Sequence, residues 1–274
     1  MHGRRAHWGL VLGTFVIACQ SASASTASNP GRTAVRRGQG LHAKVERAPC
    51  PREMVLVSRT CVDRWEAHLA VAAGSALRAH PHTERPRSDE RYLARSAPSV
   101  HPQAYISRPE AEQACSNAGK RLCTLGEWYR ACRGSSPGFY PWGARDEAGR
   151  CNTGKPHLLG KLFGRDPRRW SLVGHFNSPR LNAEPGYLAL TGEYSRCGSD
   201  LGTVDMVGNL HEWVSDVVDP ALPSKLPLRQ DILDKLVFNQ GHAIFMGGFY
   251  STTNEHGEGC GFLTPGHEAS VVSP

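Results

Sequence analysis

The sequence predicts a single α+β domain, rich in loops and stabilised by disulfides, that runs from residue 50 to residue 274. Three observations support this prediction. Capping signals mark two helices near the middle of the chain, short apolar runs mark strands on either side of them, and residues 155–194 are rich in Gly, Pro, Arg and Asn. That composition predicts mostly loop with a few short strands. About 225 residues are enough to bury one core.

The amino terminus has the pattern of a targeting segment. Two arginines precede an apolar run over residues 9–18, which is too short to anchor the chain across a bilayer. The small and apolar residues just before Cys19 resemble a bacterial lipobox, in which the cysteine is acylated and the chain is cut before it. We therefore expect residues 1–18 to be a signal peptide and Cys19 to be the lipidation site. The alternative is an ordinary signal peptide cut at Ala22 or Ala24.

Residues 19–49 are expected to form a flexible tether, because they contain almost no large apolar side chain to offset the entropy of ordering. A lipidated Cys19 would hold the protein on a membrane, and Gln20 after it resembles outer-membrane sorting. The expected location is therefore outside the cytoplasm, as an outer-membrane lipoprotein or as a periplasmic or cell-surface protein.

The net charge of the chain is +7, but most of it lies outside the domain. Without the amino-terminal arginines and the basic tether, the domain carries a net charge of about +1. A near-neutral domain does not have the charge of a nucleic-acid binder, so no nucleic-acid partner is expected. The tether's charge favours anionic lipid headgroups, or it belongs to a solvated linker without a partner.

The predicted elements follow in chain order. Residues 54–57 are apolar and partly β-branched, which predicts a strand. Residues 61–70 alternate and predict a second strand, whereas residues 75–103 are polar with four prolines and predict a long loop or insertion. Residues 243–250 predict a core strand broken at Gly247–Gly248, where glycine indicates a bulge or a close backbone approach.

Two capping boxes predict the helices. Ser107 and Glu110 have the spacing in which each side chain caps a backbone amide of the other, and Gly119 predicts the end of that helix. Thr124 and Glu127 repeat the pattern, and Gly134 predicts the second end.

The cysteine count indicates disulfides. Eight cysteines remain when Cys19 is set aside, and an even number in an exported chain is typical of a disulfide framework. We expect Cys50 to pair with Cys61, because two neighbouring strand ends can meet, and Cys151 to pair with Cys197, closing the base of the loop-rich segment. The chain has no Cys-x-x-Cys, which weighs against structural zinc.

Three motifs occur in a characteristic order. Residues 114–134 contain A-G-K-R-L-C-T-L-G-E-W, residues 139–143 read F-Y-P-W-G, and residues 205–213 read D-M-V-G-N-L-H-E-W. Together they resemble the formylglycine-generating enzyme family, also called the sulfatase-modifying factor domain. The resemblance implies a complex, loop-rich C-type-lectin-like fold. It says less about activity, because fold and chemistry separate readily.

The resemblance also locates a copper site that this sequence does not reproduce. Family members that oxidise a sulfatase cysteine hold copper(I) with two thiolates, spaced Cys-x4-Cys shortly after the Gly-Gly motif, and soft thiolates select that ion. The two positions fall at about Ser251 and His256, which are therefore groove candidates. No two cysteines of the chain are five residues apart. We expect no copper, no catalytic residue and no copper-dependent formylglycine-generating oxidase.

A third family cysteine is structural, and its position matches Cys260. The resemblance implies a Cys132–Cys260 bridge to the helix that carries the E-W motif. The family partner of Cys115 lies in a closing strand that this sequence lacks, so the final strand of the fold is expected to be missing. Cys115 and Cys123 are then free or paired with each other.

Calcium is the metal that the resemblance favours. Family members bind it through backbone carbonyls and acidic or amide side chains, which are hard oxygen ligands. The matching positions form one site around the V-G-N motif and a second one after Cys151: Val207, Gly208, Leu210 and Glu212, then Asn152 and Thr153. The alternative is that Asn209 and Glu212 only tie the loop down by hydrogen bonds.

The functional expectation is an exported binding or scaffold module that holds a peptide, glycan or protein ligand at the cell surface. One alternative is an oxidoreductase of the formylglycine-generating type that acts on protein cysteine through an altered site. A decaying paralogue, suggested by the missing end strand, is a further alternative.

Overall fold

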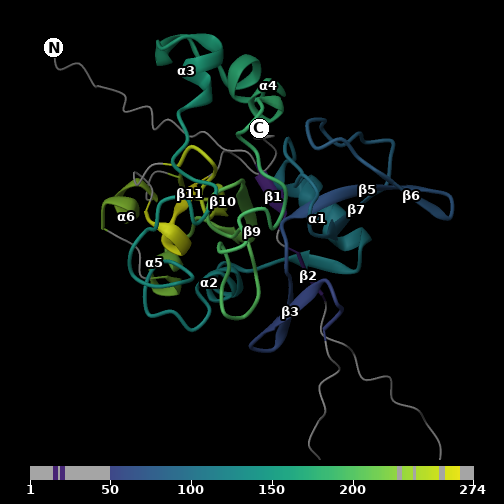
Figure 1. The fold of residues 1–274 in the computed structure, drawn as a ribbon, viewed down its shortest axis with the longest axis horizontal. Coiled ribbons are helices and arrows are strands. Elements are labelled where there is room, and N and C mark those ends of the chain that lie inside the picture. Colours follow the sequence, from purple (N-terminus) through teal and green to yellow (C-terminus); the bar gives the residue numbers. More distant parts are fainter. Residues whose placement is uncertain are drawn as a thin grey trace, which may run out of the picture.

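Three small sheets and several short helices make up the mixed α and β fold of the computed structural model (Figure 1). The structure describes residues 15–17, 19–21, 50–226, 230–236, 239–252 and 257–265. The strands are β1 (Phe15–Ile17), β2 (Cys19–Ser21), β3 (Met54–Val57), β4 (Thr60–Asp63), β5 (Ala67–Ala73), β6 (Ala76–Ala79), β7 (Tyr92–Ser96), β8 (Lys120–Leu122), β9 (His211–Val217), β10 (Ala243–Met246) and β11 (Leu263–Pro265). The α-helices are α1 (Arg108–Asn117), α2 (Leu125–Arg133), α3 (Leu158–Phe163), α4 (Arg180–Ala183), α5 (Leu222–Lys225) and α6 (Gln230–Leu236).

The sheets bring distant parts of the chain together. One has the strand order β1-β9-β10-β11, a second has β3-β4-β2-β8, and the third has β6-β5-β7. In the first sheet β9 and β10 are antiparallel, with Phe245 opposite Trp213 and Met246 opposite Glu212. Strand β1 runs parallel to β9. The loop before β9 and the loop after β10 therefore meet at one end of this sheet.

The amino-terminal segment contributes two of these strands. β1 comes from the predicted signal peptide and β2 from the start of the predicted tether, where it lies between β4 and β8. The rest of both segments, residues 1–14, 18 and 22–49, lies outside the described residues. Cleavage before Cys19 stays a prediction. Among the residues that the structure describes, no helix is long and apolar enough to cross a membrane.

Both predicted helices with capping boxes are confirmed. The Ser107 hydroxyl accepts from the backbone amide of Glu110, and the Glu110 carboxylate accepts from the amide of Ser107, at the start of α1. Thr124 and Glu127 make the same reciprocal pair at the start of α2, which ends at Gly134. These pairs satisfy amides that a helix start otherwise leaves without partners.

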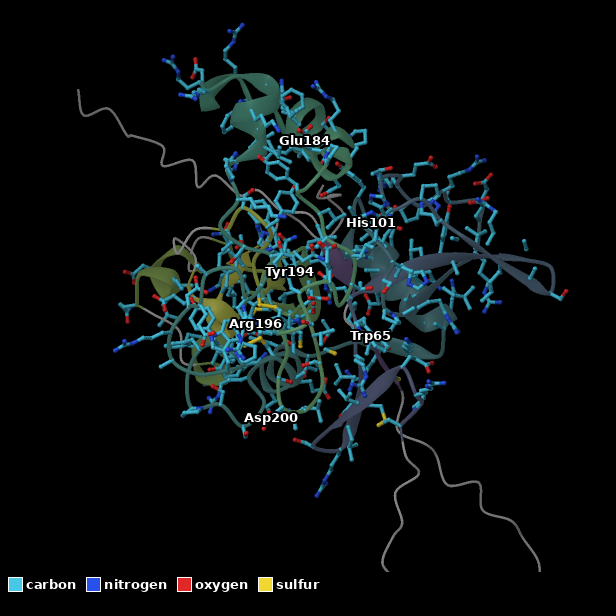
Figure 2. All side chains as sticks on the ribbon, viewed as in Figure 1. Trp65, His101, Glu184, Tyr194, Arg196 and Asp200 are labelled. Atoms are coloured by element: carbon cyan, nitrogen blue, oxygen red, sulfur yellow. A yellow bond between two sulfur atoms is a disulfide. The ribbon has the colours of Figure 1, made fainter. Side chains whose placement is uncertain are left out.

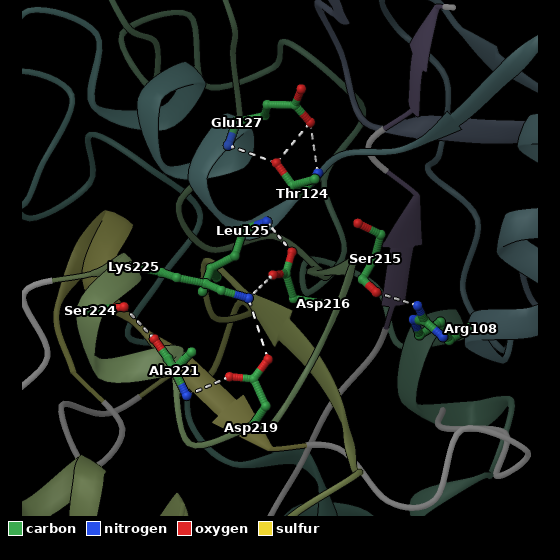
Figure 3. A network of polar contacts seen from close by, with 10 residues as sticks. All are labelled: Arg108, Thr124, Leu125, Glu127, Ser215, Asp216, Asp219, Ala221, Ser224 and Lys225. Atoms are coloured by element: carbon green, nitrogen blue, oxygen red, sulfur yellow. Dashed lines mark hydrogen bonds and ion pairs between the residues drawn. The ribbon is translucent and has the colours of Figure 1, made fainter.

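The far end of β9 is fixed to both helices (Figure 3). The Asp216 carboxylate accepts from the backbone amide of Leu125, at the start of α2, at 2.7 Å, and it also accepts from Lys225 Nζ at 2.7 Å. Arg108, at the start of α1, donates to the carbonyl of Ser215. A carboxylate at a helix amino terminus also complements the helix dipole. These contacts set the position of β9 relative to α1 and α2.

The prediction that residues 75–103 form a long loop or insertion is wrong. They contain β6 and β7, which pair with the two edges of β5. In β7 the side chains of Tyr92, Ala94 and Ser96 are buried in alternation. Flanking prolines obscured this short alternating run, because proline weakens a strand pattern without excluding a strand beside it.

The segment 155–194 holds helices where short strands were expected. It contains α3, a 3-10 turn (Pro167–Arg169), a π-helix (Leu172–Phe176) and α4. Leu158, Leu159 and Leu181 are buried there and pack with aromatic side chains such as Tyr250. Tertiary burial of these leucines outweighs the weak local helix signal of a segment rich in glycine and proline.

Three disulfides link described parts of the domain: Cys50–Cys61, Cys132–Cys260 and Cys151–Cys197. They are the same pairs as in the sequence analysis. Cys115 is also disulfide-bonded, whereas Cys123 is a buried free thiol. The two expectations that Cys115 is free, or that it pairs with Cys123, are therefore wrong. Sequence spacing could not decide this, because pairing depends on which strands and helices pack together.

Candidate functional site

Three loops meet at the amino end of β9. The loop before β9 contains Gly208 and Asn209, the loop after β10 contains Gly247, and a third loop follows Cys151. Gly208 N donates to the carbonyl of Gly247 at 2.9 Å, and Asn209 N donates to the carbonyl of Asn152 at 2.9 Å. Direct backbone bonds therefore hold these loops in one place, although they lie far apart in the chain.

Glycine is required at two of these contacts. Gly208 has a φ of +80°, and a Cβ there would lie 2.3 Å from the carbonyl oxygen of Asn152. Gly247 has a φ of +85°, and a Cβ there would lie 2.5 Å from the carbonyl oxygen of Met206. Both positions combine a left-handed backbone with no room for a side chain. The close backbone approach predicted for the glycine pair is confirmed at Gly247.

A buried polar network lies beneath the loops. The amide of Asn209 donates to Glu66 Oε2 at 2.6 Å, and the backbone amide of Leu210 donates to Glu66 Oε1 at 3.3 Å. The amide of Asn152 donates to Asn209 Oδ1 at 2.8 Å. Asn209 is held in the left-handed region, with a φ of +52°. The network thus ties the loop before β9 to Glu66, which precedes β5, and to the loop after Cys151. For Asn209 this matches the alternative in which hydrogen bonds hold the loop down.

Two further carboxyl groups lie near Glu66. Glu212, on β9, is 2% exposed and accepts from the indole nitrogen of Trp128 at 2.5 Å. Asp205 accepts from the backbone amide of Gly192 at 2.5 Å. Burial raises the pKa of Glu212 to about 8 and that of Asp205 to about 7. Burial, and then the charges of Asp205 and Glu212, raise the pKa of Glu66 well above its usual value. The cluster therefore holds protons at neutral pH.

The two predicted calcium positions adjoin one another in the structure. A Cβ on Gly208 would lie 2.5 Å from the Thr153 methyl group as well as against Asn152. Asn152 Oδ1 is buried and has no hydrogen-bond partner among the described residues, so it fits a hard cation ligand. Glu212 fits less well, because one of its oxygens already accepts from Trp128. The described residues hold no group of three His, Cys, Asp or Glu side chains suited to a metal ion.

A small cavity of about 70 Å³ opens beside the glycine pair. Its lining combines hydroxyl, carboxylate and aromatic groups with several glycines: Tyr140, Asp146, Thr153, Gly154, Val207, Gly247, Thr252, Gly259 and Phe262. Burial, followed by the charges of Asp146 and Glu258, raises the pKa of Tyr140 to about 12, so its hydroxyl stays a hydrogen-bond donor at neutral pH. The volume holds one small group or about two water molecules.

Of the two predicted groove residues, only Ser251 is described, and it does not line this cavity. Ser251 is buried and its hydroxyl donates to the carbonyl of Pro156 at 3.2 Å, whereas its neighbour Thr252 lines the cavity. His256 lies outside the described residues. The free thiol of Cys123 is at the opposite end of β9, where the carbonyl of Cys123 accepts from Ser215 N. Burial raises the pKa of this thiol well above its usual value, which makes it unreactive.

Sequence reasoning missed several residues of this site. Glu66 and Asp205 were not singled out, and neither was Tyr140 of the Y-P-W-G motif. A sequence signal existed for Tyr140, because its motif formed part of the resemblance. A signal also existed for Glu66, because residues 62–67, V-D-R-W-E-A, resemble the I-D-x-x-E-V pattern of the family's opening strand. Its burial beside β9 was not visible in the sequence.

The chain is similar in sequence to known proteins. A profile of the sulfatase-modifying factor enzyme 1-like domain matches residues 56–269. The formylglycine-generating enzyme of Streptomyces coelicolor is 32% identical over 131 residues, which are 46% of this chain and 36% of that protein. The formylglycine-generating enzyme of Mycobacterium tuberculosis is 29% identical over 117 residues, or 42% of this chain and 33% of that protein.

A relative with a different name is equally similar. The inactive C-alpha-formylglycine-generating enzyme 2 of Bos taurus is 32% identical over 117 residues, which are 42% of this chain and 32% of that protein. The chain spans about a third of the length of these curated relatives. Identity alone therefore does not separate enzymes from inactive proteins here.

Proposed function

This chain belongs to the sulfatase-modifying factor enzyme 1-like domain family, and we propose that it is a non-catalytic member that acts as a binding or scaffold module. One observation carries the proposal. The resemblance puts the first copper thiolate at about Ser251, and the Ser251 hydroxyl is buried and donates to the carbonyl of Pro156. A hydroxyl is a poor ligand for copper(I), which soft thiolates select.

The second position supports the same proposal. His256 stands where the second thiolate is expected, and the described free thiol, Cys123, is buried at the other end of β9. Relatives that are named inactive are as similar to this chain as those named enzymes, so loss of activity has a precedent among them.

The ligand that the cavity favours is a peptide or protein segment that inserts one small side chain. The cavity is too small for a sugar ring, and its hydroxyl groups, with the carboxylate of Asp146, can hydrogen-bond a polar or cationic group. A glycan would have to bind elsewhere on the surface. We infer that the mixed fold is C-type-lectin-like, and that it presents this cavity outside the cytoplasm, on an exported chain.

Calcium is proposed as a structural ion of this module. Asn152 Oδ1 and backbone carbonyls near Gly208 would hold it, with Val207, Leu210, Thr153 and Glu212 as the remaining predicted positions. Bound there, the ion would supply positive charge beside the buried carboxyl cluster and keep the three loops together.

Copper(I) titration tests the proposal. The purified chain competes with a chromogenic copper(I) chelator, and a peptide that carries a sulfatase motif is then added with oxygen. We expect no stoichiometric copper and no oxidised peptide, because the thiolate pair is absent. The variant Ser251→Cys with His256→Cys should gain copper(I) binding by at least about tenfold, because it restores two soft ligands.

The single variant Ser251→Cys is the matched control, and it should bind copper(I) more weakly than the double variant. Stoichiometric copper and peptide oxidation by the unaltered chain would overturn the non-catalytic proposal. A double variant that folds but gains no copper would show that these two positions are not the ligand positions.

A further inference from the structure

A basic projection stands out from the body of the domain. We define it as residues 158–183, which include α3 and α4. Figure 1 shows these helices side by side beyond the sheets, and they contact each other. The projection has one acidic residue, Asp166, and five exposed basic residues: Lys161, Arg165, Arg168, Arg169 and Arg180. In Figure 2 the side chains at its outer end terminate mostly in nitrogen atoms.

Local partners neutralise only part of this charge. Lys161 pairs with Glu184 at 2.5 Å, and Arg168 pairs with Asp166 at 2.9 Å. The Arg168 side chain is 89% exposed, so its ion pair is weak and open to exchange. Arg165 and Arg169 have no ion-pair partner among the residues that the structure describes. The guanidinium groups of Arg165 and Arg169 are therefore available to an external anion, and that of Arg168 becomes available when its exposed, bidentate pair with Asp166 opens.

Aromatic side chains form the interior of the projection. The Trp170 ring stacks on the ring of His157 at 5.7 Å, and its Nε1 donates to the carbonyl of Gly164 at 3.0 Å. Phe176 packs edge-on against Trp170, with ring centroids 6.4 Å apart. The rings are thus engaged with one another, and the Arg180 guanidinium lies over the Phe163 ring, 5.2 Å from its centroid. This arrangement holds the basic side chains on a small, ordered support.

We propose that the basic projection docks on the anionic phosphate headgroups of a membrane. Guanidinium groups bind phosphate oxygens in a bidentate manner, and a projecting element can reach a flat surface that a recessed site cannot. Single-stranded nucleic acid fits less well, because its binding relies on aromatic faces free to stack on bases. The rings of Trp170 and His157 are already stacked on each other. Docking of this projection on a membrane is independent of whether the chain binds copper.

Vesicle co-sedimentation tests this proposal with the full chain in unacylated form. One set of vesicles is phosphatidylcholine alone, and the other contains about one-third phosphatidylglycerol. We expect stronger binding to the anionic vesicles, and we expect the difference to shrink as salt screens the charges. The variant Arg165→Glu, Arg168→Glu, Arg169→Glu should lose at least about tenfold of that affinity, since it reverses three positive charges that would face the anionic surface.

A second triple variant controls for net charge. Arg59 lies between β3 and β4, and Arg91 and Arg95 lie at β7. All three are exposed and outside the basic projection, so their change to Glu should leave vesicle binding nearly intact. Thermal melts check that each variant folds, and a milder Arg165→Gln, Arg168→Gln, Arg169→Gln variant replaces the first one if it does not.

Equal binding to both vesicle types, or an equal loss in both triple variants, would overturn the proposal. Loss of vesicle binding in about 10 mM inorganic phosphate at constant ionic strength would also overturn it, because it would point to a free phosphate site. An oligothymidylate that binds as tightly as the vesicles, and loses affinity with the same arginines, would assign the projection to nucleic acid instead.

Discussion

The indole nitrogen of Trp128 donates a 2.5 Å hydrogen bond to the carboxylate of Glu212, a residue 84 positions later in the chain. Trp128 is buried on α2 and Glu212 is buried on β9. The bond links the helix of the first motif to the strand of the last one, and it gives a buried carboxylate one strong partner. This hydrogen bond does not fully offset the cost of burying the charged carboxylate, so the pKa of Glu212 is raised.

Glu212→Gln should make stability less dependent on pH. The pKa of Glu212 is raised from 4.5 to about 8 in the folded chain, so the folded state binds the proton more tightly than the unfolded state. Between these values stability falls as pH rises, by at most about 1.4 kcal/mol per pH unit. The variant should therefore show a smaller loss of unfolding free energy between pH 5 and about pH 8, measured by urea denaturation.

The control is Glu112→Gln, on the exposed face of α1. It should keep the pH dependence of the unaltered chain. Part of the decline should persist in Glu212→Gln, because Asp205 and Glu66 also have raised pKa values. An unchanged pH profile in Glu212→Gln would contradict the raised pKa.

Gly208→Ala should destabilise the domain far more than Gly186→Ala. Both glycines have a φ of +80°, so both changes introduce the same backbone strain of about 1–2 kcal/mol. Only at Gly208 would the new Cβ meet a backbone oxygen, 2.3 Å away, whereas nothing lies within 4 Å of it at Gly186. The difference in unfolding free energy between the two variants measures that contact. Equal losses would mean that the loops do not approach as described.

Removal of the Cys132–Cys260 disulfide should cost about 5 kcal/mol in the chain-entropy account, because the two cysteines are 128 residues apart. Cys50–Cys61 spans 11 residues, and its removal should cost about 3 kcal/mol. Each pair is changed to serine on both sides, so that no lone thiol remains, and urea denaturation gives the two losses. A larger loss of unfolding free energy for the Cys50–Cys61 bridge would show that native-state packing, not loop length, determines how much each bridge stabilises the fold.

Calcium should raise the melting temperature of the domain, and magnesium should do so much less, because a site of several protein oxygens suits the larger ion. Asn152→Ala should abolish the calcium effect, since it removes the buried Oδ1 that has no partner among the described residues. Asn117→Ala removes a half-buried amide that donates to the carbonyl of Tyr92, far from the site, and should keep the effect. If the unaltered chain melts at the same temperature with and without calcium, the proposed ion is not bound.

Local signals were enough to predict several elements of this protein. The capping boxes at Ser107 and Thr124 depend on residues three positions apart, so their helices could be recognised without any tertiary information. The strand at residues 54–57 and the family motifs were also visible in the sequence. The helices of residues 158–183 were not, because buried leucines and aromatic contacts stabilise them more than local propensity does.

What the sequence by itself determined is the family, the capped helices and the absence of a cysteine pair at positions 251 and 256. Only the tertiary structure decided that Glu66, Asp205 and Glu212 share one buried cluster, and that Thr252 rather than Ser251 lines the cavity. The physical reason is that these properties arise from contacts between distant segments, namely the pairing of β9 with β10 and the hydrogen bonds of Asn209 and Leu210 to Glu66. These contacts bury polar side chains together, where their charges and hydrogen bonds depend on each other.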